Sequence, residues 1–484
     1  MAWALWEDLD LMSTNVDVSV RITGRQRLIL FLLLGTQFML SVDFSILNVA
    51  LPHVGDGVGI ALADLPWVVT AFALPLAGFT LLFGRIADLY GRRRLFLTGV
   101  ALLAVSSLLG GVATEPALLL TARTLQGLAT AIATPAALSL LTTSFTDEKQ
   151  RARILGLNGA LLSAGFTAGA LVGGLLVSVL NWRWAFLINV PFAVVILVVT
   201  PFVVAASKAQ GGVRLDVPGA VTVTGGLLAF AYGVTNRSVW ALVVGVALLV
   251  AFWFVERRAT APLASVRILN RPSVKWGNLG GLLTMSMMTG ALFLLTLYLQ
   301  DVLLFSPLNT GLIFGIPGIA SVFAGVLAGR FINRYGTRAV LTAGLGVQGL
   351  MNVPLLLLGS GRISLVILLP TLFVAFFAHV TAIVSFMVTA TSGLPNSEQG
   401  LATGLATLAQ QIGITVGIPV ISAIAAVRTG LLPGLHVVAA VEIVVLLVGV
   451  ALIWRGLRAP SEVVTGDEPV AREPDRAGAG ELAA

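Results

Sequence analysis

The sequence predicts an all-α integral membrane protein with fourteen transmembrane helices. Hydrophobic residues make up 57% of the 484 residues and charged residues only 11%, against roughly 45–50% and 25% in soluble domains. Apolar runs long enough to cross a hydrocarbon layer of roughly 30 Å recur along the whole chain. These runs start near Leu28, Leu65, Leu95, Ala117, Ile154, Trp184, Val217, Trp240, Trp276, Leu308, Ala339, Ser364, Leu401 and Val437.

A short basic connection, GRIADLYGRRR at residues 84–94, joins the second and third runs. Its two glycines permit a tight turn and a close helix approach, and its single acid, Asp88, can pair with a neighbouring arginine. Cytoplasmic loops collect arginine for topology alone, but topology does not explain Asp88 or the glycines. We therefore expect a conformational gate made of Gly84, Arg85, Asp88, Gly91 and Arg92.

This connection resembles the signature G-x-x-x-D-x-x-G-R-R between helices 2 and 3 of the major facilitator superfamily. A related copy, GRFINRYGTR at residues 329–338, has Asn333 in the place of Asp88. Repetition of a loop with its flanking helices indicates internal duplication, and the two halves of this superfamily are parallel repeats. The resemblance implies a six-helix half, two inserted helices and a second six-helix half, at residues 28–205, 217–255 and 276–457.

The basic residues predict the orientation. All but five of the 29 Lys and Arg fall in the termini or in even-numbered connections, so we expect a multi-pass protein of the plasma (inner) membrane with both termini in the cytoplasm. Residues 1–27 form a polar N-terminal segment that serves as an uncleaved insertion signal, with Met12 as an alternative start. The tail 459–484 is rich in Pro, Ala, Gly and acids, and we expect it to be disordered.

Two charged residues inside spans lie at matching depths. Asp43 in the first span is somewhat beyond the midplane toward the outside, and Arg123 is roughly 10 Å from the outer end of the fourth span. An ionisable residue in the membrane is a functional candidate because it is costly, and opposite charges reduce each other's desolvation cost. We expect the two to approach each other. The alternatives are a purely structural pair and an Arg123 that reaches the outer interface.

The surrounding motifs extend the resemblance to the fourteen-helix drug:proton antiporter branch. D-x-x-x-x-N-V-A-L-P contains Asp43 and Asn48, R-T-L-Q-G contains Arg123 and Gln126, and NWRWAFLINVP lies at residues 181–191. The resemblance implies that Asp43 and Arg123 couple transport to protons, since a change in their distance changes the proton affinity of the carboxyl group. The expected substrate cavity includes Asn48, Gln126 and His379.

The fifth span carries glycines at four-residue spacing, which lets another backbone approach closely. The helix-packing motif consists of Gly165, Gly169, Gly173 and Gly174, and we expect it at the interface between the halves. It resembles the antiporter motif G-x-x-x-G-P-x-x-G-G, with Ala170 in the place of the proline. The resemblance implies that the glycines still pack closely against a neighbouring helix. Whether this span has the kink or leak barrier attributed to the proline is left open.

Two groups of the second half can titrate within spans. We expect His379 to form a neutral hydrogen bond between helices, and Glu442 to lie near a helix start within reach of water.

Several functions are excluded by missing residue types. The chain has no cysteine for disulfides or thiol catalysis. None of its three lysines follows a glycine, so there is no phosphate-binding loop, and HExxH is absent. Three scattered histidines do not form a metal-ligand pattern. We therefore expect neither an enzyme nor a bound metal or cofactor. The formal charge of +7 does not require a nucleic-acid partner, because basic residues set the membrane topology and contact anionic lipid headgroups.

Together these patterns predict proton-coupled export of a small hydrophobic or amphiphilic compound, such as a drug or antibiotic, by alternating access. The alternative is a dedicated metabolite transporter of the same superfamily that is not necessarily proton-coupled. We expect a monomer in the lipid bilayer, with protons and the small-molecule substrate as its other partners.

Overall fold

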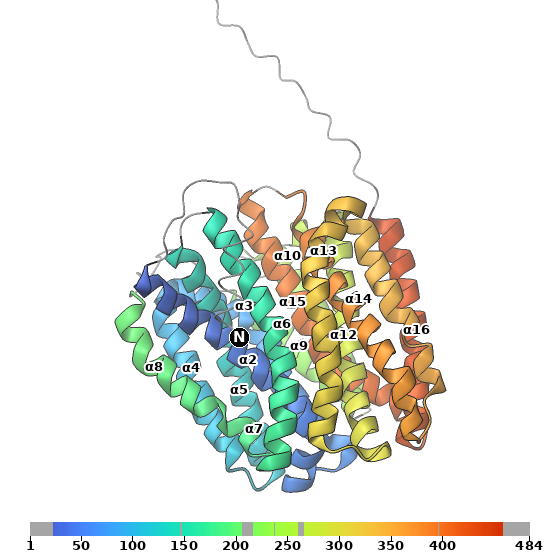
Figure 1. Ribbon diagram of the computed structural model, residues 1–484. Helices are drawn as coiled ribbons and strands as arrows, with labels where there is room; N and C mark the ends of the chain where they lie inside the picture. The colour runs from blue at the N-terminus through green and yellow to red at the C-terminus, as the bar shows by residue number, and fades with distance from the viewer. Residues whose placement is uncertain are drawn as a thin grey trace, which may run out of the picture.

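The computed structural model describes residues 23–145, 148–205, 216–236, 238–259, 266–394 and 396–457. The predicted tail 459–484 and most of the N-terminal segment 1–27 lie outside these ranges. Every regular element within them is helical (Figure 1). Eleven helical segments in the described part are long and apolar enough to cross a membrane, and α3 and α6 contain shorter apolar stretches. The all-α membrane class is therefore supported, while the count of fourteen and the repeat layout stay predictions.

The first group of helices comprises α2 (Gly24–Val58), α3 (Pro66–Tyr90), α4 (Arg92–Gly111), α5 (Pro116–Ser144), α6 (Glu148–Val179), α7 (Trp184–Leu187) and α8 (Asn189–Val203). The helices α9 (Val217–Thr235), α10 (Val239–Arg258) and α11 (Val266–Leu269) follow. The last group comprises α12 (Pro272–Leu297), α13 (Pro307–Leu350), α14 (Leu365–Thr391), α15 (Asn396–Ala425) and α16 (Leu431–Gly456). Short helical turns occupy Leu62–Asp64, Tyr298–Val302, Pro354–Leu357 and Arg362–Ser364.

The helices assemble into a bundle with two sides. In Figure 1 the blue and green helices α2 to α8 lie on one side, and the yellow to red helices α12, α13, α14 and α16 lie on the other. Between the sides, α6 packs on α13 and α3 packs on α15. The helix α9 packs on α10, α3 and α15, so the inserted pair sits against the junction of the two sides.

Each copy of the basic loop places a glycine with positive φ between two helical segments. Gly91 has a φ of 100° between α3 and α4, and Gly336 has a φ of 81° inside α13. Glycine adopts this backbone conformation without the steric cost of a Cβ atom. As a result α13 is divided into two helical segments, 307–335 and 337–350.

The arginine two residues after each of these glycines binds the end of a distant helix. Nη1 of Arg93 donates to the Val204 carbonyl at 2.9 Å and to the Pro201 carbonyl at 3.2 Å, at the end of α8. Nη2 of Arg338 donates to the Trp454 carbonyl near the end of α16. Cationic donors satisfy the free carbonyls of a helix C-terminus. Equivalent contacts at both loops are what a duplicated half would produce.

The glycine stripe of α6 packs against α2. A Cβ atom added at Gly169 would lie 2.6 Å from the Val42 carbonyl oxygen, and one at Gly173 would lie 2.9 Å from Ile46 Cα. The stripe itself therefore faces α2 within the first group of helices, and of the predicted motif only Gly174 lies at the contact with the other side.

The contact of α6 with the second side uses a neighbouring face. A Cβ atom added at Gly174 would lie 2.5 Å from the Pro307 carbonyl oxygen, and Gly311 packs against the Ala170 backbone. Consecutive helical residues point about 100° apart at 3.6 residues per turn. Gly174 and Ala170 therefore face α13, while the preceding residues Gly173 and Gly169 face α2.

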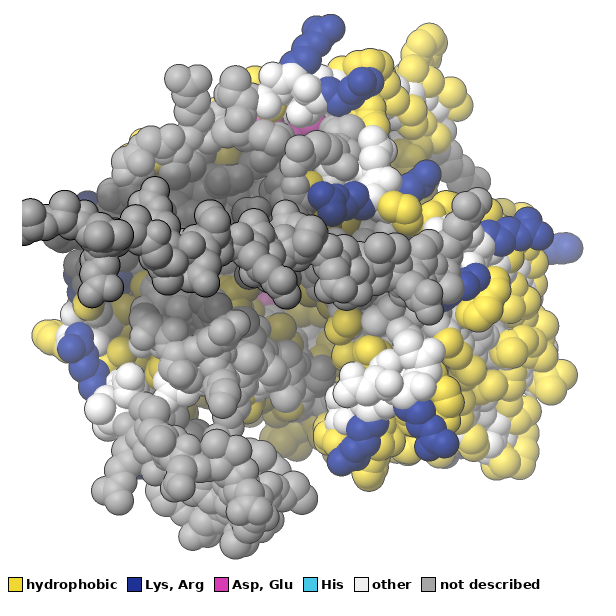
Figure 2. Space-filling model, turned by 90° about the horizontal axis from the view of Figure 1, so that it is seen from above, with side chains coloured by type: hydrophobic (Ala, Val, Ile, Leu, Met, Phe, Trp, Pro, Cys, Tyr) yellow, Lys and Arg dark blue, Asp and Glu magenta, His cyan; other side chains and the backbone are white. Residues whose placement is uncertain are grey.

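Lys and Arg side chains are exposed at the end of the bundle that carries the basic loops (Figure 2). Figure 2 views the end that is uppermost in Figure 1, where dark blue Lys and Arg side chains occur in several groups among yellow hydrophobic side chains. This distribution agrees with the predicted cytoplasmic end, although the orientation itself stays a prediction.

Candidate functional site

A buried ion pair joins α2 to α5. Nη1 of Arg123 lies 3.6 Å from Oδ2 of Asp43, and the two residues are 1% and 2% exposed. The sequence-based prediction that these charges approach each other agrees with the structure. Their role in proton coupling stays a prediction.

Three uncharged side chains complete this cluster. Nη1 of Arg123 donates to Gln126 Oε1 at 2.8 Å, and Gln126 Nε2 donates to Ser107 Oγ at 3.0 Å and to Asp43 Oδ1 at 3.4 Å. Nδ2 of Asn189 also donates to Asp43 Oδ1. One carboxylate oxygen thus accepts two amide donors, while the other faces the guanidinium. We name Asp43, Ser107, Arg123, Gln126 and Asn189 the Asp43 cluster.

The helix α3 holds the other side of the guanidinium. Nε of Arg123 donates to the Val68 carbonyl at 3.1 Å, and the guanidinium carbon lies 4.4 Å from the centroid of the Phe72 ring. A hydrogen bond and a cation–π contact therefore orient Arg123 from α3. Arg123 and Gln126 are three residues apart on α5 and so share a face of that helix.

The Asp43 cluster is not saturated with hydrogen bonds. Asp43 Oδ2, Arg123 Nη2 and Asn189 Oδ1 have no hydrogen-bond partner among the described residues. Buried charges cost several kcal/mol each in desolvation unless pairing and hydrogen bonds compensate. The geometry of this cluster therefore leaves the buried carboxylate and guanidinium only partly compensated by hydrogen bonds.

Sequence reasoning missed two members of the cluster, Ser107 and Asn189. Asn189 begins α8 and lies within the NWRWAFLINVP segment, directly after the single turn α7. Ser107 follows another serine within the apolar helix α4. In both cases the available signal was a polar residue inside a predicted span.

The predicted cavity residues belong to different surroundings. Gln126 is a member of the Asp43 cluster. Nδ2 of Asn48 donates within its own helix, to the Phe44 carbonyl at 3.1 Å, and the residue is buried. Nδ1 of His379 on α14 lies 2.9 Å from Thr284 Oγ on α12, which confirms the expected hydrogen bond between helices. Among the described residues, no hydrogen bond or ion pair connects His379 to the Asp43 cluster.

Glu442 is not near a helix start. The helix α16 begins at Leu431, directly after Gly430, so Glu442 lies in its middle and is 2% exposed. The expectation of water access from a helix end is wrong because the helix extends further toward the N-terminus than the predicted start at Val437.

The structure describes only part of the predicted gate. The side chains of Arg85 and Asp88 lie outside the described residues. Gly91 makes the turn, and Arg92 begins α4. Gly84 lies within α3, and an added Cβ atom would meet Pro135 Cβ at an ordinary 3.6 Å. The expectation that Gly84 serves the turn is therefore wrong, because the chain reverses seven residues later.

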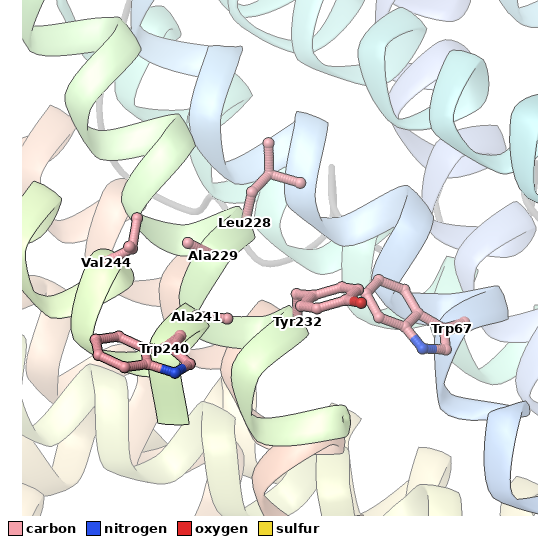
Figure 3. A pocket seen from close by; sticks show the side chains of 7 residues that line it. All are labelled: Trp67, Leu228, Ala229, Tyr232, Trp240, Ala241 and Val244. Atoms are coloured by element: carbon pink, nitrogen blue, oxygen red, sulfur yellow. The ribbon is translucent and has the colours of Figure 1, made fainter. Parts of the chain in front are cut away.

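An apolar groove of about 550 Å³ lies beside the inserted helices. Figure 3 shows Trp67 of α3 and Tyr232 of α9 close together, and Trp240 of α10 further along the lining. The ring centroids of Trp67 and Tyr232 are 6.0 Å apart. The lining residues carry no charge, which suits contact with lipid rather than the chemistry of the Asp43 cluster.

Comparison with known proteins gives consistent matches. Residues 33–418 match the family described as Major Facilitator Superfamily. The chain is 34% identical over 408 residues to the Puromycin resistance protein pur8 of Streptomyces alboniger, which covers 82% of this chain and 81% of that protein. It is 36% identical over 399 residues to the Cephamycin export protein CmcT of Amycolatopsis lactamdurans, which covers 79% and 82%.

A solved structure shares the fold. The crystal structure of the POT family transporter PepTSo superposes with a TM-score of 0.67 at 16% identity, and the match covers 88% of this chain and 97% of that one. At this identity the likeness concerns the fold alone.

Proposed function

The chain belongs to the Major Facilitator Superfamily and is a membrane transporter rather than an enzyme, and we propose that it exports a small hydrophobic or amphiphilic compound in exchange for protons. Two relatives are named for resistance to, or export of, an antibiotic. Their names favour efflux of an antibiotic-like compound by this chain.

The Asp43 cluster is the observation that carries the proposed coupling. Asp43 is buried opposite Arg123, and amide groups hold its second oxygen. Burial favours the neutral form of a carboxyl group, while a guanidinium and amide donors favour the ionised form. A motion that changes the distance between Asp43 and Arg123 therefore changes proton binding, and a conformational equilibrium that depends on protonation is what coupling requires.

The available energy is sufficient for useful efflux. One proton that moves across about 100 mV supplies roughly 2.3 kcal/mol. Since about 1.4 kcal/mol corresponds to a tenfold ratio, this energy supports roughly fifty-fold accumulation of a neutral solute.

Contacts between the two sides of the bundle support alternating access. Gln300 Nε2 donates to the Val49 carbonyl at 2.8 Å, and the Leu308 amide donates to Ser178 Oγ at 3.1 Å. Both bonds lie at the end where α2, α6 and α12 finish, opposite the basic loops. We infer that this end is the outer gate, closed in this conformation, and that residues 28–205 and 276–457 rock against each other as two halves with the inserted helices 217–255 beside them.

A vesicle experiment tests the proposal. The full chain is expressed in inverted membrane vesicles with an acidified lumen, and puromycin is added as the probe compound. We expect proton release from the lumen that depends on the compound, and accumulation of puromycin that collapses when an ionophore removes the gradient. Puromycin movement that is equal with and without the gradient would instead favour the uncoupled metabolite transporter.

A further inference from the structure

A second buried polar cluster connects α12, α13 and α14. Nε2 of Gln348 donates to the Thr284 carbonyl at 3.2 Å, which turns Gln348 Oε1 toward the Thr284 hydroxyl. That hydroxyl donates to Oε1 at 2.5 Å and therefore accepts from Nδ1 of His379 at 2.9 Å. The bonds assign the neutral tautomer of His379 with its proton on Nδ1, and they leave Nε2 as the basic nitrogen.

Glu442 on α16 faces the same region. It lines a cavity of about 30 Å³ together with Gln348 of α13, Asn352 just after that helix, and Thr371 of α14. Glu442 Oε1 has no hydrogen-bond partner among the described residues. A cavity of this size holds about one water molecule, and amide, hydroxyl and carboxyl groups offer that water the two to four partners it needs.

The two buried clusters use helices in corresponding places. The Asp43 cluster is built from the first, third, fourth and sixth helices of its group, namely α2, α4, α5 and the α7–α8 segment. The second cluster uses α12, the part of α13 after Gly336, α14 and α16. In the order of the expected halves these are again the first, third, fourth and sixth helices. The acidic residue lies on the first helix in the Asp43 cluster, at Asp43, and on the sixth helix in the second cluster, at Glu442.

We propose that Glu442 is a second proton-binding group of the transporter, which exchanges its proton through the small polar cavity inside the C-terminal helices. The proposal rests on the proposed proton-coupled export. It adds a proton site to the half that lacks a counterpart of Asp43.

The surroundings of Glu442 favour a proton over a larger ligand. A cavity for one water molecule excludes a drug-sized compound, and a buried carboxylate without a cation is costly to keep ionised. None of the other charged or titratable groups on the described parts of the surrounding helices lines the cavity; they are Lys275, Tyr298, Asp301, Arg330, Arg334, Tyr335, Arg338, His379, His436 and Arg455. A proton is therefore the simplest ligand that neutralises Glu442. When a conformational change lets water reach the carboxyl group, hydration stabilises its ionised form and the proton can leave.

Infrared difference spectroscopy tests the proposal without any transported compound. The full chain in lipid nanodiscs is titrated from acid to alkaline pH, and the stretching band of protonated carboxyl groups is recorded for wild type, Asp43→Asn and Glu442→Gln. We expect a component that wild type and Asp43→Asn share, that Glu442→Gln lacks, and that disappears on titration. A component that persists at every pH would make Glu442 a structural neutral group, and identical bands in wild type and Glu442→Gln would show that it is never protonated. Either result overturns the proposal.

A transport measurement adds the functional consequence. In proteoliposomes with puromycin as the probe, we expect Glu442→Gln to halve the number of protons exchanged per exported molecule. Glu256→Gln is the matched control, because Glu256 on α10 is also a buried glutamate, at 3% exposed against 2% for Glu442, but lies on an inserted helix. An unchanged ratio in Glu442→Gln, or an equal fall in Glu256→Gln, overturns the proposal. If no variant transports puromycin while the infrared band titrates, the proposed substrate fails and the proton site stands.

Discussion

The guanidinium of Arg123 lies 3.6 Å from the carboxylate of Asp43, with both side chains almost fully buried. The two belong to different helices, α5 and α2, so the ion pair reports directly on how these helices are placed. The same contact therefore serves both the stability of the N-terminal helices and the proposed binding of a proton.

Asp43→Asn is expected to abolish proton-driven export while the protein still folds. Asparagine keeps the shape and an acceptor oxygen for Asn189 and Gln126, but it cannot take up a proton in exchange for solute. The measurement is proton release from inverted vesicles on addition of puromycin, with membrane insertion checked by protein yield. Wild-type proton flux in this variant would remove Asp43 from the coupling role and direct attention to His379 or Glu442.

Arg123→Ala is expected to destabilise the protein as well as to stop export. Loss of one partner of a buried ion pair leaves an uncompensated charge, typically at a cost of about 3–5 kcal/mol. Arg123→Lys should restore only part of the function, because one ammonium cannot reproduce separate contacts to Asp43, Gln126 and the Val68 carbonyl. Thermal unfolding in nanodiscs and vesicle export measure the two effects, and full export by the lysine variant would contradict the need for a guanidinium.

Ser107→Ala should slow proton-driven export. The expected loss corresponds to about 0.5–1.5 kcal/mol, the usual net contribution of one hydrogen bond. Ser107 accepts from Gln126, which in turn donates to Asp43. Ser106→Ala is the matched control, since the Ser106 hydroxyl donates to the Leu102 carbonyl of its own helix at 2.7 Å. Equal export rates in the two variants would show that the Ser107 contact does not support coupling.

Gly169→Leu is expected to block transport by displacing α2 next to Asp43. Even a Cβ atom at this position would lie 2.6 Å from the Val42 carbonyl oxygen, and overpacking of this kind typically costs about 1–3 kcal/mol. Gly325→Leu is the control, because no atom lies within 4 Å of a Cβ atom added at that helical glycine. Vesicle export and thermal unfolding are compared for both, and normal export by Gly169→Leu would mean that the close α2–α6 contact is dispensable.

Arg93→Ala should destabilise the end of α8 by about 1.5–3 kcal/mol, as expected for hydrogen bonds from a charged donor. Arg93 donates to the carbonyls of Pro201 and Val204. Hydrogen exchange at residues 196–204 gives the local effect. Arg94→Ala is the comparison, since Arg94 is exposed in the same first turn of α4; similar exchange in both variants would argue against a specific cap.

Long apolar runs and the duplicated loop were sufficient to predict the all-α membrane class, because membrane insertion depends on the summed hydropathy of about twenty consecutive residues. The depth of Asp43 and Arg123 was also predictable, since helical rise converts residue number into distance along a span. Matching depth therefore favoured a contact between them, and the packing of α2 on α5 produced it.

Rotation of each helix about its axis was decided only by the tertiary structure. Ser106 bonds its own helix while Ser107 reaches Gln126, and the sequence offers two equivalent hydroxyls one position apart. The same applies to α6, where Gly173 meets α2 and Gly174 meets α13. All sides of these spans are apolar, so no polar face indicates which residue points inward. Sequence alone thus determined the all-α membrane class and the matching positions of Asp43 and Arg123 along their helices, whereas packing between helices decided which neighbours surround them.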